Sequence, residues 1–325
     1  MKTIRDLFVH ELVDLRNAAQ AFHGVLQRMA SVATHPEVRS LLEAYFYQSE
    51  YQEKNLRSYL TEQAVVGEEK CSVAQALCEH ALESIRFDGS AEIRDVALLV
   101  SANRIQHFEI TALGTALSHA ELLELEEEID LVTSLQNKIA EDVSEPVKLI
   151  ANRLSEVDGE QEVYAFLGEL LQAQRSDARI LLDWMPRLDA HISTELLKEA
   201  FATYKDRQEQ ILAQLNVLSR DFPQGIERKS WEVMPGFTQE WVEDLKGSYI
   251  GILQDVGIIM TMQRIQHQNI ALYEVEERLA EQLGLSEVKD SFSEAVVWET
   301  SSDESFIALT EGSFFQEGLY SDLQG

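Results

Sequence analysis

The sequence predicts an all-α protein built from two helical bundles in tandem. Apolar residues recur every three to four positions along eight long segments, which is typical of amphipathic helices that pack together. Only 5 prolines and 15 glycines interrupt the 325 residues. The string Arg-Ile-Gln-His occurs at 104–107 and again at 264–267, 160 positions apart (264 − 104). Such a recurrence within long apolar-periodic segments indicates one module that has been duplicated.

The first half is expected to contain four long helices and one short helix. The long segments lie at about 3–33, 37–63, 91–119 and 122–157. A short helix is expected over 72–85, between the second and third long helices. Pro36 follows the break at Thr34-His35 and suits the first turn of the second helix. Pro146 is expected to kink or end the fourth helix, because proline cannot donate an interior helical hydrogen bond.

The second half repeats this order after a polar break at Asp158-Gly159. Its long segments lie at about 160–190, 193–219, 250–283 and 286–309, with a short helix near Gln239. We therefore expect one domain over 1–158, a second over 159–311 and a tail over 312–325. The tail carries three aromatic residues among glycines, and its sequence fits a disordered segment as well as one docked on a neighbour.

Composition narrows the possible partners and the compartment. The chain has 27 basic and 57 acidic side chains, giving a formal charge of −30. This argues against nucleic-acid binding, which depends on cationic contacts to phosphate. The acidic surface fits a solvated exterior, and it also fits attraction of cations or of a basic partner. No apolar run reaches about 18 residues and no cleavable leader is recognisable, so a cytoplasmic protein without a membrane span is expected.

Common catalytic and structural motifs are missing from the sequence. Cys71 and Cys78 lie two helical turns apart, about 10 Å, which is too far for a disulfide. Two thiols alone do not form a zinc site, so reduced cysteines are expected. No G-x-S-x-G string and no phosphate-binding glycine loop appears.

A helical projection separates the residues of the repeated string. At 100° per residue, Ile105, Gln106 and Glu109 fall on the apolar face of the third helix, whereas His107 falls outside it. We therefore expect His107 and its counterpart His267 to be surface histidines.

Four strings give the chain a family resemblance. They are MKTIRDLFVHELVDL at the start, the pair Lys70-Cys71, SANRIQHFEITALGT from 101, and LGLSEVKD from 283. Together they resemble the YciE/YciF family of ferritin-like proteins. The match is good over about 1–145 and weaker, but in register, over about 163–310. The resemblance implies two tandem ferritin-like four-helix bundles, each with a short extra helix between its second and third helices.

Ferritin-like bundles commonly hold two metal ions between inward carboxylates and histidines. In the first half, the family's inward positions fall on Ala19, Tyr45, Gln48, Gln106, Glu109, Lys138 and Asp142. In the second half they fall on Asp177, Tyr204, Arg207, Gln266, Asn269, Glu299 and Asp303. Both halves thus replace the same histidine with tyrosine and the same glutamate with glutamine. Too few anionic oxygens remain for a di-iron or di-manganese site.

We therefore expect no metal or other cofactor. The hypothesis is that polar side chains replaced the metal, with Lys138 and Arg207 as inward cations that balance the remaining acids. Buried acids need such compensation, because an unpaired charge inside a bundle is costly.

The leading functional hypothesis is a non-enzymatic structural or interaction protein, with a stress-related role implied by the family resemblance. The two bundles are expected to pack as an intramolecular pseudo-dimer around a pseudo-two-fold axis. A homo-oligomer or larger assembly is a further hypothesis, based on the charge and the aromatic tail.

The alternative is a di-iron or di-manganese oxidase, or a peroxide-consuming enzyme, with its site in the second half. This activity would require a set of acids to converge within bonding distance of a metal. The candidates are Asp177, Asp206, Glu209, Glu299 and Asp303.

Overall fold

The computed structural model describes residues 3–65, 71–139, 144–220, 222, 231–246 and 251–311. All regular secondary structure within these ranges is helical, so the predicted all-α class is confirmed. In chain order the helices are α1 (Ile4–Val32), α2 (Pro36–Glu62), α3 (Ser72–Ile85), α4 (Ala91–Leu122), α5 (Glu126–Gln136), α6 (Glu145–Leu154), α7 (Glu160–Asp189), α8 (Glu195–Leu218), α9 (Met234–Lys246), α10 (Ile252–Gln282) and α11 (Ser286–Glu311).

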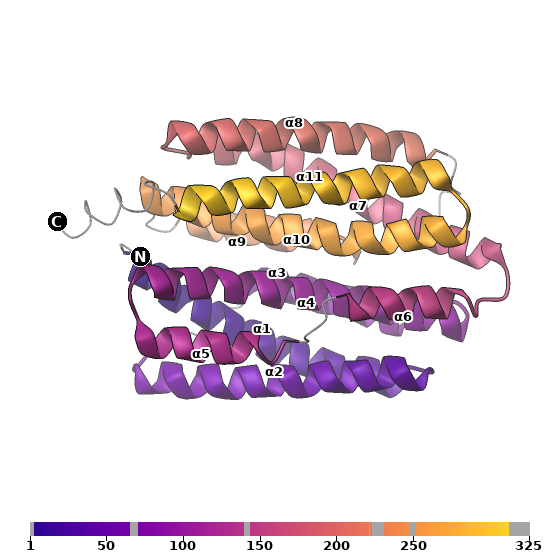
Figure 1. Ribbon diagram of the computed structural model, residues 1–325, viewed down its shortest axis with the longest axis horizontal. Coiled ribbons are helices and arrows are strands. Elements are labelled where there is room, and N and C mark those ends of the chain that lie inside the picture. The colour runs from indigo at the N-terminus through magenta and orange to yellow at the C-terminus, as the bar shows by residue number, and fades with distance from the viewer. Residues whose placement is uncertain are drawn as a thin grey trace.

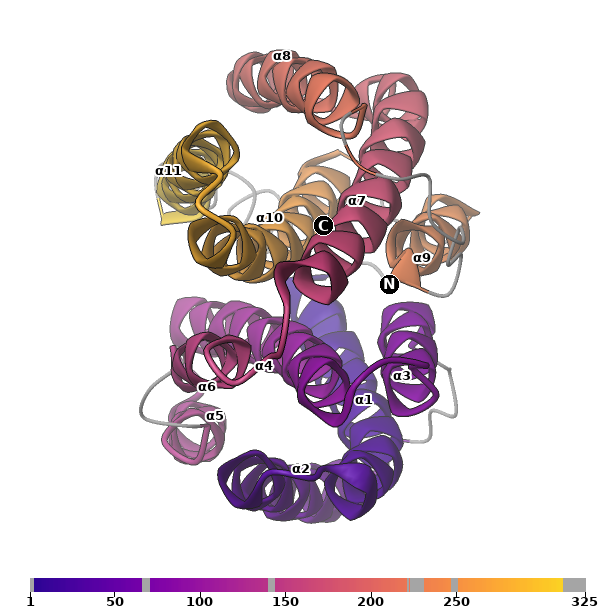
Figure 2. The same ribbon diagram turned by 90° about the vertical axis from the view of Figure 1, so that its right-hand side faces the viewer.

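The helices form two layers that lie against each other along the long axis of the molecule (Figure 1). Helices α1 to α6 make one layer and α7 to α11 the other. The end-on view shows α4 facing α10 and α3 facing α9 where the two layers meet (Figure 2). We refer to these layers as the first and second halves. No helix among the described residues is both long enough and apolar enough to cross a bilayer.

Each half has a buried aspartate at the equivalent position, and its carboxylate holds one turn by hydrogen bonds. The carboxylate of Asp95 accepts hydrogen bonds from the Thr34 amide (2.9 Å), the Thr34 hydroxyl (2.7 Å) and the His35 amide (2.8 Å). Asp255 accepts the equivalent bonds from Ser193 and Thr194 at 2.8, 2.8 and 3.0 Å. Positions 95 and 255 are again 160 apart. These turns precede α2 and α8, so the repeat seen in the sequence is a repeat of local structure.

The fourth helix differs from the prediction in the first half. The expected segment 122–157 is divided into α5 and α6. Pro146 lies in the first turn of α6, so it begins a helix there and does not kink or end one. Helix α6 packs against both α4 and α10. In the second half α11 continues unbroken for 26 residues.

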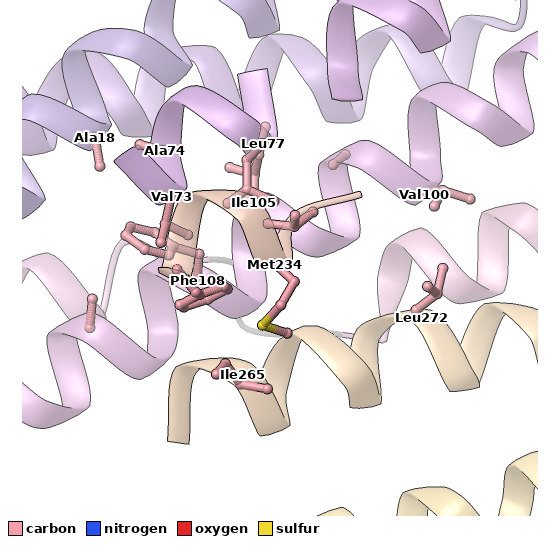
Figure 3. Packing of buried hydrophobic residues seen from close by; sticks show 14 of the residues in the cluster. Ala18, Val73, Ala74, Leu77, Val100, Ile105, Phe108, Met234, Ile265 and Leu272 are labelled. Carbon is pink, nitrogen blue, oxygen red and sulfur yellow. The ribbon is translucent and has the colours of Figure 1, made fainter. Parts of the chain in front are cut away.

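One apolar core continues from the first half into the second. Figure 3 shows Ile105 and Phe108 of α4 near Ile265 of α10, with Met234 of α9 between the layers. All four side chains are at least 97% buried. Burial of this kind contributes about 25 cal/mol per Å² of apolar surface, so the contact between the halves is part of the core.

Candidate functional site

The arginine of the first repeated string reaches into the second half. Arg104 donates from Nε to the Gln268 side chain (3.1 Å) and from Nη1 to the Trp231 carbonyl (3.1 Å). Its Nη2 lies 3.9 Å from the carboxylate of Asp177. Burial lowers the pKa of Arg104 to about 10, while Asp177 and Glu276 oppose that effect.

The arginine of the second string makes the reciprocal contact. Arg264 forms a buried ion pair with Glu11 of α1 and lies 3.8 Å from Glu240 of α9. Burial alone would lower the pKa of Arg264, but Glu11, Glu240 and Asp14 outweigh it and raise the pKa overall. The guanidinium also lies 5.7 Å from the ring centre of Phe108.

These contacts follow the pattern of an isologous interface. Arg104 contacts Gln268, and Arg264 contacts Phe108, where 104 pairs with 264 and 108 pairs with 268 at the repeat offset. In such an interface residue i contacts j and j contacts i.

The two histidines of the repeated strings meet across this interface. The rings of His107 and His267 have centroids 5.8 Å apart. His107 is only 6% exposed, and burial, with a smaller effect from His267, lowers its pKa to about 3. The expectation of a surface histidine was therefore wrong for His107. The projection treated the outward face of one bundle as solvent, whereas the other bundle covers it.

Gln106 belongs to a polar core inside the first half, as the projection predicts. Its Nε2 lies 3.2 Å from Oε2 of Glu109, and Nε2 of Gln48 on α2 lies 3.5 Å from the same oxygen. Tyr45, one turn before Gln48, is 1% exposed. Burial raises the pKa of Glu109 to about 8. A carboxyl with this pKa is largely protonated at neutral pH, which removes the need for a partner cation.

The second half has its own polar core around Glu299 of α11. Oε1 of Glu299 accepts hydrogen bonds from Gln208 of α8 and from Asn269 of α10, both at 2.7 Å. Burial raises the pKa of Glu299 to about 7, and the two amide donors limit the rise. Tyr204 is 1% exposed nearby, and burial together with the charge of Glu299 raises its pKa. Gln266 is also fully buried.

The two predicted inward cations do not pair with these carboxyls. Lys138 is exposed, with Nζ 5.8 Å from the ring centre of Tyr51, so its placement inside the first half was wrong. Arg207 is half-buried and donates to the Trp298 carbonyl and the Ser302 hydroxyl at 3.2 and 2.7 Å. Amide groups therefore bond these carboxyls directly, and the charge of Arg207 makes a smaller contribution that lowers the pKa of Glu299. Asp142 lies outside the described residues.

The acids proposed for a divergent metal site do not converge. Asp206 and Glu209 are exposed on α8. Glu299 lies inside the second half, and Asp303 bonds instead to Gln263 (3.1 Å) and lies 3.4 Å from Nε2 of His267.

The fifth acid of that set, Asp177, has a structural role. It accepts hydrogen bonds from the backbone amides of Val233 and Met234 at 3.0–3.1 Å. Those amides lie at the start of α9, where unpaired N–H groups favour an anion. Burial raises the pKa of Asp177 to about 6, and Arg104 opposes the rise.

Gln208 and Glu276 are among the buried polar residues that were absent from the sequence-based set. Gln208 lies one turn after Tyr204 and shares its face, so a projection of α8 would have identified it. Glu276 is fully buried, seven residues after Asn269. From the sequence alone, a charged side chain at this position is expected to be exposed to solvent. Burial raises the pKa of Glu276, opposed by Arg104 and by the amide of Gln174.

The polar cores do not fit a di-metal site. Such a site needs several anionic oxygens around two divalent ions, whereas Glu109 and Glu299 are each bonded by side-chain amides. Two other buried acids of the second half, Asp177 and Glu276, bond to the backbone amides at the start of α9 and to Gln174, respectively. Among the described residues, one group of three acidic or thiol side chains lies close enough to share an ion: Asp14, Cys71 and Glu240. It lies at the interface beside Arg264, outside both polar cores.

Comparisons with known proteins bear on the same two halves. A family described as "domain of unknown function (DUF892)" matches residues 3–155 and again residues 163–317. Protein YciF of Escherichia coli (strain K12) is 26% identical over 164 residues, which cover 50% of this chain and 97% of that protein. No solved structure matches the chain.

Proposed function

The chain belongs to the DUF892 family through both of its halves, and from this premise we propose that it is a ferritin-like structural or interaction protein that has lost its di-metal chemistry. The proposed architecture is two ferritin-like bundles, at 1–158 and 159–311, joined within one chain. The tail 312–325 lies outside the described residues.

The observation that carries this proposal is the make-up of the two polar cores. Gln48 and Gln106 face Glu109, and Gln208 and Asn269 face Glu299. A carboxylate that binds a divalent ion needs its lone pairs directed at the ion, whereas Oε2 of Glu109 and Oε1 of Glu299 each accept two amide hydrogens. Neutral amides cannot offset four positive charges, so the cores are suited to packing and not to metal binding.

The reciprocal contacts between the halves support an intramolecular pseudo-dimer. Arg104 and Arg264 each bind acids of the other half, and His107 meets its own counterpart His267. Equivalent residues touch each other only close to a two-fold axis. We infer that the tandem chain preserves, within one molecule, a contact that separate copies of the domain would make.

A stress-related, cytoplasmic role is part of the same proposal and rests on the family resemblance. With a net charge of −30, nucleic acid is an unfavourable partner. Assembly into a homo-oligomer or with a basic protein partner is compatible with this charge.

Elemental analysis of the purified full-length chain tests the proposal. The protein should be produced in medium with added iron and manganese and passed over a desalting column before measurement. Substoichiometric iron and manganese is the expected result. About two ions per bundle, the stoichiometry of a di-metal carboxylate protein, would contradict it and favour the oxidase alternative.

A further inference from the structure

An open cleft of about 610 Å³ lies between α4 of the first half and α10 and α11 of the second. Its lining includes Thr111 and Gly114 of α4, His267 of α10 and Asp303 of α11. Its volume is within the range of about 300–1,000 Å³ that is typical of small-molecule sites, which often lie between domains.

The cleft exists because the two halves complete their fourth helix differently. In the first half α6 packs against both α4 and α10. In the second half α11 runs on unbroken. The equivalents of Gln263 and His267, at the repeat offset, are Asn103 and His107. Those two are buried, at 0% and 6% exposure, whereas Gln263 and His267 are both partly exposed at the cleft.

Half of the eight α4 residues that form one wall of the cleft are small. Thr111, Gly114, Thr115 and Ser118 all line it. A Cβ atom added at Gly114 would meet no other atom within 4 Å, so packing does not require glycine at this position. Glycine in a helix interior weakens the helix relative to alanine. Gly114 therefore keeps the cleft wide at some cost to helix stability.

The hydroxyls of this wall are engaged within their own helix. Thr111, Thr115 and Ser118 donate to the backbone carbonyls four residues earlier, at 2.8, 3.0 and 3.1 Å. No hydroxyl is oriented as a nucleophile toward His267, so the cleft is suited to binding and not to acyl transfer.

The opposite wall combines an acid with an apolar surface. Asp303 accepts from Gln263 (3.1 Å) and lies 3.4 Å from His267, which leaves lone pairs on the carboxylate for a further donor. Val256, Met260 and Ile307 supply apolar surface beside it.

The charge of the lining is negative. Asp303 and Glu121 both line the cleft, and its described lining includes no lysine or arginine. An anionic ligand would face these acids without a fixed cation, whereas an ammonium group would gain a charge-assisted hydrogen bond.

We propose that this cleft binds a small amphipathic organic cation, with an ammonium group at Asp303 and an apolar body against Met260 and Ile307. The site uses neither Glu109 nor Glu299, so it is independent of the state of the polar cores. Its formation requires both halves of the chain, because α4 comes from one and α10 and α11 from the other.

The test is a displacement titration on the full-length chain. The neutral fluorescent probe N-phenyl-1-naphthylamine reports occupancy of the cleft, and octylamine and octanoate, used below their micelle concentrations, compete for it. Octylamine should displace the probe at concentrations roughly tenfold or more below those needed for octanoate, as expected for one charge-assisted bond. Equal competition by the two compounds, or no binding of the probe, would overturn the proposal.

Two variants on opposite walls locate the binding. Gly114→Leu fills the cleft from α4, and Asp303→Asn removes the charge on α11. Each should weaken octylamine binding about tenfold or more. Gly24→Leu is the matched control, because Gly24 is an exposed glycine within α1 and also has open space at its Cβ. Thermal melts verify that each variant is folded. Unchanged octylamine binding in either cleft variant would contradict the proposed location.

Discussion

The fourth helix of the first half is broken after Gln136, and α6 packs against α4 and α10, whereas the second half continues along α11 and leaves an open cleft beside α10. The two halves share their turn anchors, Asp95 and Asp255, and their interface arginines. They differ where the fourth helix is broken or continuous. This difference shows that a duplicated bundle can keep its core and its interface while one of its two equivalent grooves stays open.

The two polar cores differ in how they stabilise a buried carboxyl group. Glu109 lies at 3.2 and 3.5 Å from two glutamine amides, and its pKa is about 8. Glu299 accepts two amide bonds at 2.7 Å, and its pKa is about 7. The first core relies more on protonation and the second more on hydrogen bonds.

The largest effect is expected from the interface arginines. Arg264→Ala leaves Glu11 buried without its partner, and removal of one member of a buried pair costs about 3–5 kcal/mol. Arg104→Ala should cost less, because the Asp177 carboxylate keeps two backbone donors. Urea unfolding of the full chain measures both. Arg57→Ala, which removes an exposed guanidinium from its pair with Glu53 on α2, is the control and should change stability by less than about 1 kcal/mol. Equal, small effects at all three sites would contradict the reciprocal interface.

The turn anchors should come next. Asp255→Ala removes three hydrogen bonds to a buried carboxylate and is expected to cost about 2–3 kcal/mol in the free energy of unfolding. Asp95→Ala should cost more, because Arg153, 3.6 Å from Asp95, is itself only 4% exposed. Chemical denaturation followed by circular dichroism ranks the two variants. If Asp255→Ala proved the more damaging, the ion pair with Arg153 would have no stabilising role.

Glu109→Gln should stabilise the protein in a pH-dependent way. An unfolded glutamate loses its proton near pH 4.5 and Glu109 near pH 8. Between these values the folded state holds the extra proton, so the free energy of unfolding falls as pH rises. The variant removes this loss and should be more stable than the wild type by about 4 kcal/mol at pH 8, with little gain at pH 4.

Glu299→Gln provides the comparison for that variant. The pKa of Glu299 is about 7, below that of Glu109. The wild-type protein therefore loses less stability through Glu299 as the pH rises to 8, and Glu299→Gln should gain less stability at pH 8 than Glu109→Gln. Unfolding curves at pH 4, 6 and 8 for both variants test this order. A destabilised Glu109→Gln protein at pH 8 would show that the ionised carboxylate is needed in the first core.

Substitutions of two glycines should have the smallest effects on stability. A Cβ at Gly236 would lie 2.8 Å from the Ser72 carbonyl oxygen where α9 packs on α3, so Gly236→Ala should lower stability by about 1 kcal/mol or more. Gly114→Ala should raise it by about 0.5–1 kcal/mol, because its Cβ meets open space. Melting temperatures measure both changes. If Gly114→Ala lowered the stability, the space beside Gly114 would be more crowded than this structure shows.

Periodicity predicted the helical ranges well because each long helix buries an apolar face, although α4 and α10 are buried on a second side as well. It did not predict the division of the fourth helix, since Pro146 is compatible with both the end and the beginning of a helix. The projection placed Gln106 and Glu109 correctly, because their environment is a single bundle.

Other residues could not be placed from one helix at a time. His107 is buried by the second half, and Lys138 lies two residues after the end of α5, where it is exposed. Asp177 and Glu11, which pair with Arg104 and Arg264 from the opposite half, lie more than 70 residues away along the chain, and these pairs follow from the packing of the halves. Long-range contacts of this kind leave no local periodicity in a single sequence.

The most direct test of the central claim compares the wild-type chain with a variant in which family-type ligands are restored. Tyr45→His, Gln48→Glu and Gln106→Glu together place ligands around Glu109 at positions that the structure brings to one polar core. Iron content after loading with ferrous ions under anaerobic conditions is the measurement. The account predicts substoichiometric iron in the wild type and a clear gain, toward two ions in the first bundle, in the restored variant. About two ions per bundle in the wild type would contradict the claim that amide cores have replaced the metal.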